Sequence, residues 1–302
     1  MKDSITTILY NRQLAPGYYC MGIAAPEYPQ LARPGQFVML RIKQGYDPLL
    51  RRPFGIFRTG TLGLSNPGTA IQEELVTQDG MGTLDYIEVV YKVVGRGTRL
   101  MAHLAAGDEV GLLGPLGQGF CISPDAGGAM HDAVLVGGGI GVVPLFMLAQ
   151  QLVGRGVNVR LLLGGRSSGD ILALAEFEGL GVETFVSTDD GSLGEKCFST
   201  QLLKDTLQEI SAAQVFACGP TPMLHAVRQI CVAAKVELQV SLEAMMACGV
   251  GACLGCVVKG RNHSEQHPEY LCTCKQGPVF DARELAWTPE GAAPGEDSIC
   301  IV

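Results

Sequence analysis

Residues 133–156 read AVLVGGGIGVVPLFMLAQQLVGRG, and this stretch decides the class of fold. An uncharged apolar run typical of a buried strand leads into three consecutive glycines, and an apolar segment of helical length follows with Pro144 near its start. A glycine-only loop lets the backbone approach a pyrophosphate, and the start of the next helix supplies unpaired N–H groups. The stretch therefore predicts a nucleotide-binding turn, although close packing of a strand against a helix would also favour glycine.

The same alternation of strand and helix continues downstream as VNVRLLLGGRS, ILALAEFEGLG, VETFVSTDDG and QVFACGP, and it predicts a parallel sheet. A second strand-to-helix turn contains Cys218, Gly219 and Pro220. Ligands bind at the carboxyl ends of such strands. We expect a dinucleotide to contact the glycines and the proline of these two turns: Gly138, Gly139, Gly141, Gly219 and Pro220. Asp189 could face the ribose hydroxyls and so favour NAD over NADP, or it could belong to a plain Asp-Gly turn.

Upstream, to about residue 122, short β-rich runs alternate with Pro and Gly, which predicts an antiparallel barrel. The runs include GQFVMLRI, RRPFGIF, LDYIEVVYKVV and DEVGLLGPLG. Arg52 before Pro53 could present its guanidinium to a pyrophosphate, and the Gly97-Thr98 turn could offer backbone N–H groups to the same anion. The alternative is a surface arginine in an extended turn.

The most specific signal is CGVGACLGC, which spaces Cys248, Cys253 and Cys256 as C-x4-C-x2-C, with further cysteines at 272 and 274. Four thiolates in this spacing are typical of a plant-type [2Fe–2S] site. We expect Gly249, Gly251 and Gly255 to provide tight, positive-φ turns that aim backbone N–H groups at the sulfur atoms. Zinc and ordinary buried thiols are the alternatives, but structural zinc sites usually have two short cysteine pairs. On spacing alone, either Cys272 or Cys274 could be the fourth ligand.

The length of 302 residues, with 47% hydrophobic and 17% charged residues, excludes a disordered tail or a mini-protein. The formal charge of -8 argues against nucleic-acid or anionic-membrane binding. Residues 133–149 are uncharged but too short and glycine-rich for a membrane span. The eleven cysteines and the absence of a visible export signal favour reduced thiols and a cytoplasmic protein.

We therefore expect an α+β multidomain chain. Residues 1–125 would form an antiparallel β-barrel, which with its RRPFG motif resembles the FAD-binding domain of ferredoxin-reductase-like flavoproteins. Residues 126–237 would form a parallel-sheet α/β domain that binds NAD, and residues 238–302 a small [2Fe–2S] domain with an acidic tail.

Nearly the whole chain resembles the electron-transfer subunits of NAD-dependent, two-component (class 1B) dihydroorotate dehydrogenases, which are ferredoxin-reductase-like flavoproteins. The resemblance rests on RRPFGI, YKVVGRGT, GDEVGLLGPLGQGF, VGGGIGVVPL, STDDGS, CGPTPML, SLEAMMACGVGACLGCVVK and CKQGPVFD. It implies that Cys274, directly before KQGPVF, is the fourth cluster ligand. It also implies a set of FAD contacts, namely Arg52, Pro53, Phe54, Gly55, Val90, Tyr91, Lys92, Gly97 and Thr98.

Two further residues gain an interpretation from the resemblance. Gly55 stands where the family usually has Ser, so a hydroxyl near the flavin is missing. Cys218 resembles the cysteine that such reductases place near the nicotinamide, although a buried thiol acting as a small hydrophobe is an equal interpretation.

The resemblance implies a function in pyrimidine (UMP) biosynthesis, within a heterotetramer. A catalytic partner subunit bearing FMN would oxidise dihydroorotate, and this chain would relay the electrons through the cluster and FAD to NAD. No catalytic acid or base is expected, because the hydride step itself needs none. Two alternatives are a reductase of the NAD(P)H–ferredoxin or sulfide- or sulfite-linked kind, and a non-enzymatic redox sensor.

Overall fold

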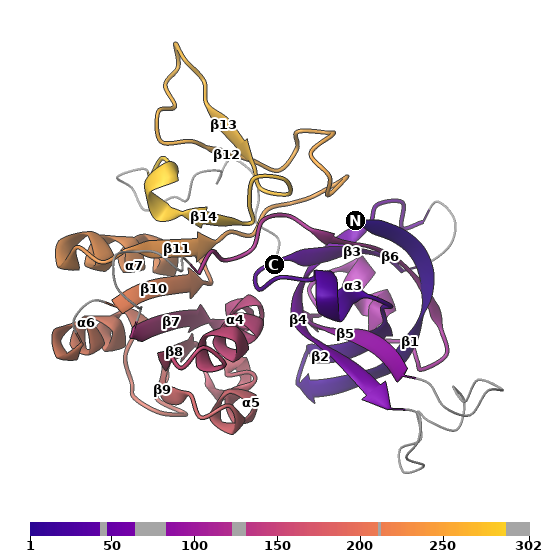
Figure 1. Cartoon of the computed structure of the whole chain (residues 1–302), viewed down its shortest axis with the longest axis horizontal. Helices are drawn as coiled ribbons and strands as arrows, with labels where there is room; N and C mark the ends of the chain where they lie inside the picture. The colour runs from indigo at the N-terminus through magenta and orange to yellow at the C-terminus, as the bar shows by residue number, and fades with distance from the viewer. Residues whose placement is uncertain (43–46, 64–82, 123–130, 211–212, 288–302) are drawn as a thin grey trace.

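The structure of the chain, a computed structural model, describes residues 1–42, 47–63, 83–122, 131–210 and 213–287. These residues form a closed β-barrel, a six-stranded sheet flanked by helices, and a two-stranded hairpin. Figure 1 shows the barrel and the helix-flanked sheet side by side, with the hairpin at the top. The expected architecture is confirmed. The acidic tail from residue 288 onward and Cys300 lie outside the described residues.

The barrel consists of six antiparallel strands in the order β1-β2-β5-β4-β3-β6. The strands are β1 Lys2–Ala15, β2 Tyr18–Ala24, β3 Phe37–Arg41, β4 Arg52–Gly63, β5 Thr83–Lys92 and β6 Glu109–Leu116, and two short helices, α1 Tyr28–Leu31 and α3 Arg96–Met101, lie between them. In β6 burial alternates residue by residue, because successive side chains point to opposite faces of the sheet. Val110 and Leu112 therefore join the barrel core.

The second sheet has the order β14-β11-β10-β7-β8-β9, in which only β14 is antiparallel to its neighbour. Its strands are β7 Asp132–Gly138, β8 Asn158–Gly165, β9 Glu183–Thr188, β10 Ala213–Cys218, β11 Leu238–Ser241 and β14 Val279–Asp281. Its helices are α4 Val143–Val153, α5 Leu174–Gly179, α6 Ser199–Glu209 and α7 Thr221–Ala234. Strands β11 and β14 follow the boundary expected after residue 237, yet they pair into this sheet.

Helix α4 fixes the sheet against the barrel. It is apolar on most sides, and its residues Leu145, Phe146 and Leu148 are buried. The Phe146 ring lies 4.6 Å from the ring of Phe57 in β4 and 5.1 Å from that of Phe177 in α5. One hydrophobic core therefore runs from the barrel into the sheet and holds the two parts in a defined relation.

The cysteine-rich segment leaves the sheet after β11 and returns to it at β14. Between them lies a hairpin of β12 Val257–Lys259 and β13 Tyr270–Cys272. The segment also touches the barrel, since a side-chain carbon at Gly249 would lie 2.5 Å from Cγ of Met39 in β3. The cysteine loop thus packs against both larger parts of the chain.

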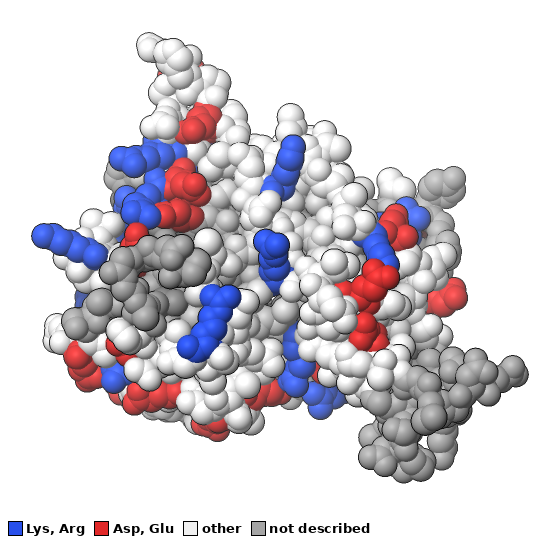
Figure 2. All heavy atoms as spheres, in the orientation of Figure 1, with Lys and Arg blue, Asp and Glu red and all other residues white. Residues whose placement is uncertain are grey.

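Each helix in the described part of the chain is too short or too polar to span a bilayer. Residues 133–149 form β7, a short 3-10 helix at Gly139–Val142 and the start of α4. Figure 2 shows acidic side chains along the lower margin of the sheet domain and separate basic side chains down the middle of the same face.

Candidate functional site

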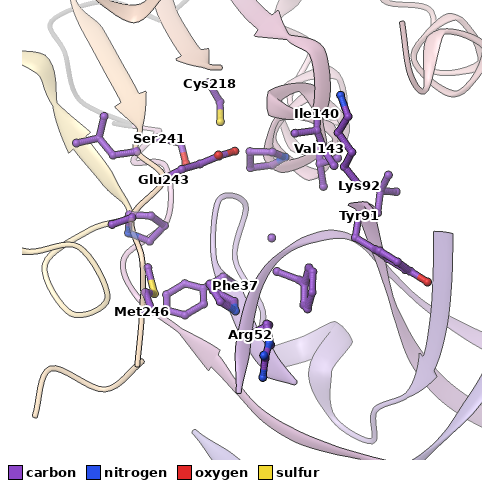
Figure 3. Close-up of a pocket in the computed structure, with 18 of the residues that line it drawn as sticks. Phe37, Arg52, Tyr91, Lys92, Ile140, Val143, Cys218, Ser241, Glu243 and Met246 are labelled. Atoms are coloured by element: carbon purple, nitrogen blue, oxygen red, sulfur yellow. The ribbon is translucent and has the colours of Figure 1, made fainter. Parts of the chain in front are cut away.

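A first cavity of about 260 Å³ opens between the barrel, the start of α4 and residues 241–246 (Figure 3). The barrel residues that the sequence analysis assigned to FAD line it with the exception of Gly97: Arg52, Pro53, Phe54, Gly55, Val90, Tyr91, Lys92 and Thr98. The structure therefore brings the motifs of the neighbouring strands β4 and β5 to one cavity.

Aromatic rings form one wall of this cavity. Tyr91 is buried, its ring stacks on Tyr19 at 5.6 Å, and Phe54 meets it edge-on at 5.9 Å. The Tyr91 hydroxyl donates a hydrogen bond to Asn11 at 3.0 Å. Burial raises the pKa of Tyr91 to about 12. The two ring contacts and the hydrogen bond to Asn11 hold the ring in place.

Arg52 and Gly97 approach each other closely beside the cavity. A side-chain carbon at position 97 would lie 2.5 Å from Nε of Arg52, so glycine leaves the space that the guanidinium occupies. The Thr98 hydroxyl accepts hydrogen bonds from the backbone N–H groups of Val94 at 2.9 Å and Gly95 at 3.1 Å. Thr98 thus fixes the turn that carries Gly97.

Position 55 has room for a side chain, so close packing does not explain its glycine. A side-chain carbon there would meet only Cγ1 of Val143, at 3.9 Å, which is ordinary contact. The serine that the resemblance leads us to expect at this position would therefore fit, and the glycine has no steric reason.

A second cavity of about 600 Å³ lies at the carboxyl ends of β7, β8, β9 and β10. Its lining includes the residues that the sequence analysis assigned to the dinucleotide, apart from Cys218: Gly138, Gly139, Gly141, Asp189, Gly219 and Pro220. Gly141 is required by close approach, because a side-chain carbon there would lie 2.4 Å from the carbonyl oxygen of Cys218. The two glycine turns therefore touch, and their backbones form one floor.

The sequence left open whether Asp189 faces a ribose or belongs to a plain turn, and the two neighbouring residues Asp189 and Asp190 differ in this respect. Asp189 lines the cavity. Asp190 accepts hydrogen bonds from the backbone N–H of Ser192 at 2.9 Å and from its hydroxyl at 2.6 Å. The turn is therefore held by the Asp190 carboxylate, and Asp189 is the acidic residue of the pair that lines the cavity.

The two cavities meet at three residues, Lys92, Ile140 and Glu243, which line both. The Glu243 side chain is exposed to the cavities, and desolvation by the cavity walls raises its pKa. Cys218 lines the first cavity beside it and is almost fully buried, and this burial raises the pKa of its thiol. Figure 3 shows Cys218, Ser241 and Glu243 grouped at this end of the cavity.

The cysteine loop presents backbone N–H groups to sulfur atoms. Gly251 donates to Sγ of Cys274 at 3.0 Å, Cys253 donates to Sγ of Cys248 at 3.4 Å, and Cys274 donates to Sγ of Cys256 at 3.4 Å. Burial opposes ionisation of Cys248, but backbone donors that include Val250 and Cys253 lower its pKa to about 6. Amide donors of this kind stabilise thiolate ligands.

The loop differs from the sequence expectation in one detail. Gly249 and Gly251 have positive φ, as expected, but the third left-handed residue is Leu254 and not Gly255. The local turn is set by its neighbours, so the non-glycine Leu254 takes the strained conformation. The prediction for Gly255 was wrong.

Cys274 and Cys272 lie in different surroundings. Cys272 is in β13, and its carbonyl accepts hydrogen bonds from Lys275 at 3.0 Å and Gln276 at 2.8 Å, which form a turn. Cys274 is at the tip of that turn, and its sulfur receives the N–H of Gly251. The thiols are free, and no three His, Cys, Asp or Glu side chains of the described residues are placed to hold a metal ion together. The fit to a cluster therefore rests on the thiol set and on the amide donors around it.

Comparisons with known proteins agree with these three features. Residues 243–286 match the iron–sulfur cluster binding domain of dihydroorotate dehydrogenase B, and residues 135–229 match an oxidoreductase NAD-binding domain. The electron transfer subunit of dihydroorotate dehydrogenase B (NAD(+)) from Bacillus velezensis is 36% identical over 95% of this chain and 100% of its own length. The corresponding subunit from Geobacillus thermodenitrificans is 38% identical over 92% of this chain and 96% of its own.

The chain belongs to the electron transfer subunits of dihydroorotate dehydrogenase B. The family expected from the sequence motifs is thus confirmed. Among solved structures, a chain of the NADH-dependent reduced ferredoxin-NADP oxidoreductase superposes with a TM-score of 0.73 at 26% identity, covering 94% of this chain and 90% of its own. A ferredoxin NADP+ reductase from Neisseria gonorrhoeae has a TM-score of 0.57 at 19% identity, covers 78% of this chain and 92% of its own, and shares the fold.

Sequence reasoning missed several residues that line the second cavity of this electron transfer subunit, among them Phe198 and Arg166. Phe198 precedes α6, lines the second cavity and is 69% exposed. Arg166 follows β8 and lines the same cavity. An aromatic side chain after a loop carries no signal in sequence, because its exposure depends on where the loop lies.

A polar group between the barrel and the sheet was also missed. The Tyr18 hydroxyl of β2 donates to Asp170 at 2.5 Å, and Lys92 of β5 lies 3.4 Å from the same carboxylate. Arg166 lies 3.3 Å from its other oxygen. Burial opposes ionisation, but the Tyr18 hydrogen bond and the two cations together lower the pKa of Asp170. This group closes the edge of the second cavity.

Proposed function

We propose that this chain relays electrons between a cluster in its cysteine loop, FAD in the first cavity and NAD in the second, as part of an NAD-dependent dihydroorotate dehydrogenase B. One observation carries this proposal. The two cavities meet at Lys92, Ile140 and Glu243, while the cysteine loop packs against the opposite end of the first cavity. Electron transfer from a cluster through FAD to NAD requires the FAD site to lie between the other two sites.

FAD would be bound by the barrel residues, including Gly97 beside Arg52. The Arg52 guanidinium would pair with the pyrophosphate, since its fork of donors matches phosphate oxygens. The Phe54 and Tyr91 rings would bound the flavin on the barrel side, and Gly55 would leave the backbone close to it.

NAD would lie along the ends of the parallel strands. Its pyrophosphate would rest on the glycine floor of Gly138, Gly139, Gly141 and Gly219, with Pro220 at the start of α7. Asp189 would accept hydrogen bonds from the ribose hydroxyls, which favours NAD because a carboxylate repels a 2′-phosphate. The exposed ring of Phe198 would stack on the adenine. Between β10 and β9 lie three strand spacings of about 4.8 Å each, which suits an extended dinucleotide.

When bound, the flavin would convert between single electrons and the hydride of the nicotinamide. The protein would contribute placement. Cys218, Ser241 and Glu243 would border the nicotinamide where the cavities meet, and Lys92 would keep its ammonium beside Asp170. No side chain is assigned the role of catalytic acid or base.

Cys248, Cys253, Cys256 and Cys274 would hold the [2Fe–2S] cluster. Cys253 is exposed, so the cluster would come close to the surface there. An FMN-bearing catalytic subunit would dock at this surface, in a heterotetramer with two copies of each chain.

We also propose the division into three domains at about residues 125 and 237. Strands β11 and β14 would then belong to the third domain by sequence and would pair with the sheet of the second domain.

The test is anaerobic reconstitution with FAD, iron and sulfide. NADH should bleach the flavin and then produce the electron paramagnetic resonance (EPR) signal of a reduced cluster. With the catalytic subunit added, dihydroorotate should reduce NAD+. Reduction of the chain by NADH without any activity alongside that subunit would instead support a reductase with another partner.

A further inference from the structure

An apolar cluster lies between the first cavity and two of the cysteines. Its buried members are Phe37, Met39, Leu116, Cys256 and Cys274, and its half-buried members are Leu113, Ala244 and Met246. Phe37, Ala244 and Met246 also line the first cavity. Figure 3 shows Phe37 and Met246 next to each other, at the end of the cavity away from Cys218.

The four cysteines are unequally exposed. Cys256 is 3% exposed and Cys274 is 2% exposed, and both belong to this apolar cluster. Cys248 is half-buried and Cys253 is exposed. The site therefore has a dry side that faces the first cavity and a wet side that faces solvent.

Phe37 and Met246 lie between the cavity and the thiols. Phe37 is 4% exposed and Met246 is half-buried, and each packs in the apolar cluster that holds Cys256 and Cys274 while it also lines the cavity. Met246 is flexible and polarizable, which suits it to fill an irregular gap. Together with Ala244, these side chains separate the cavity from the buried sulfur atoms.

We infer that Phe37, Ala244 and Met246 form a dry partition that holds the reduction potential of the cluster low. The inference rests on the proposed function, because it requires the cluster and FAD to occupy these sites. Reduction adds one negative charge to a cluster that is already anionic. Apolar surroundings disfavour that charge, and polar groups or water stabilise it. A polar side chain in the partition should therefore raise the potential.

The experiment compares two neighbouring methionines that both line the first cavity. Met246→Gln replaces a member of the partition by a polar side chain of similar size. Met245→Gln is the matched control, because Met245 is 50% exposed and is not part of the apolar cluster. Met246→Leu keeps the position apolar. The readout is a redox titration of the cluster EPR signal in the full chain loaded with FAD.

We expect Met246→Gln to shift the cluster potential to a more positive value. Met245→Gln and Met246→Leu should leave it at the wild-type value. Ala244→Ser gives a second route with little change in volume, and it should shift the potential in the same direction by less. Equal potentials for Met246→Gln, Ala244→Ser and wild type would overturn the partition, as would an equal shift in Met245→Gln. A wild-type chain without a cluster signal would overturn the proposed function, and the partition with it.

Discussion

The first cavity has two unlike ends. Toward the cysteine loop its lining is apolar, with Phe37 and Met246 in front of buried thiols. Toward the second cavity it is polar, with Lys92 and Glu243 at the opening. A single electron needs no water and no proton to cross, whereas a dinucleotide must enter, bind through charges and leave. Under the proposed function, the apolar end would serve the electron and the polar end the dinucleotide.

One short segment supplies side chains to both ends. Ser241 is the last residue of β11, and Glu243 follows it at the polar end. Three residues later Met246 lies at the apolar end. Because this segment passes directly into the cysteine loop, strand β11 fixes both the dinucleotide opening and the position of the thiols.

The largest effect is expected from the loss of a proposed cluster ligand at the cysteine end of the first cavity. Cys274→Ser should abolish the cluster and reduce electron transfer to the catalytic subunit by more than ~100-fold, which exceeds the ~10–100-fold usual for residues that only support a metal ligand. NADH should still reduce the flavin, because the polar end is intact. Iron content and the EPR signal measure the loss.

Cys272→Ser is the matched control for that change. Cys272 lies two residues away, and its backbone forms the turn through its carbonyl. Its substitution should leave the cluster in place. Loss of the cluster in Cys272→Ser with retention in Cys274→Ser would reverse the assignment.

The next effect concerns the floor of the polar end. Gly141→Ala places a carbon 2.4 Å from the carbonyl oxygen of Cys218, and backbone atoms cannot move aside as a flexible side chain does. We expect a loss of about 1–3 kcal/mol of stability, typical of overpacking, and weaker NADH binding. Thermal unfolding and titration of NADH measure these effects.

Gly55→Ala is the corresponding change in the first cavity. The added carbon meets only Val143 at 3.9 Å. Its unfolding temperature should stay at the wild-type value. Equal destabilisation by both substitutions would mean that the close contact at Gly141 relaxes.

A smaller effect is expected at the polar group that joins the barrel to the sheet. Asp170→Asn keeps an acceptor for Tyr18 but loses the ionic contacts with Lys92 and Arg166. We expect a loss of roughly 0.5–1 kcal/mol at pH 7, because Tyr18 keeps an acceptor and the lost ion pairs with Lys92 and Arg166 are partly exposed. The folded-state pKa of Asp170 is lowered, so its contribution is present above the unfolded value of about 3.9 and is lost as the pH falls through the folded value.

Urea unfolding at pH 7 and at acidic pH tests this dependence. The stability difference between wild type and Asp170→Asn should shrink as the pH falls. Tyr18→Phe removes the neutral donor and leaves both ion pairs, so it separates the hydrogen bond from the charges. A difference that stays constant with pH would show that Asp170 acts through packing alone.

What could be predicted from sequence was local. The glycine turns at 137–141 and 218–220 and the cysteine loop are continuous stretches of sequence. The two turns line the second cavity, and the cysteine loop places backbone N–H groups near the thiols. The missed features depend on distant pairing. Tyr18 and Asp170 are 152 residues apart, and β11 and β14 join a sheet that the earlier strands had begun. Periodicity and motif spacing carry no information on such contacts, and the positive φ of Leu254 likewise depends on its neighbours.

The smallest effect is expected at Glu243, where the polar end carries a charge in confined surroundings. Desolvation raises its pKa, so the folded protein keeps the proton to higher pH than the unfolded chain does. The associated stability is therefore complete below the unfolded value of about 4.3 and is lost as the pH rises through the folded value. Because glutamine does not ionise, Glu243→Gln should not lose stability in this way as the pH rises. In the chain without nucleotide, its unfolding temperature should equal that of wild type near pH 4 and exceed it at pH 8, while Glu178→Gln on the exposed face of α5 should change neither. If the wild type were instead more stable than Glu243→Gln at pH 8, the Glu243 carboxylate would be stabilised where the cavities meet. The polar end would then carry its negative charge without loss of stability before the dinucleotide binds.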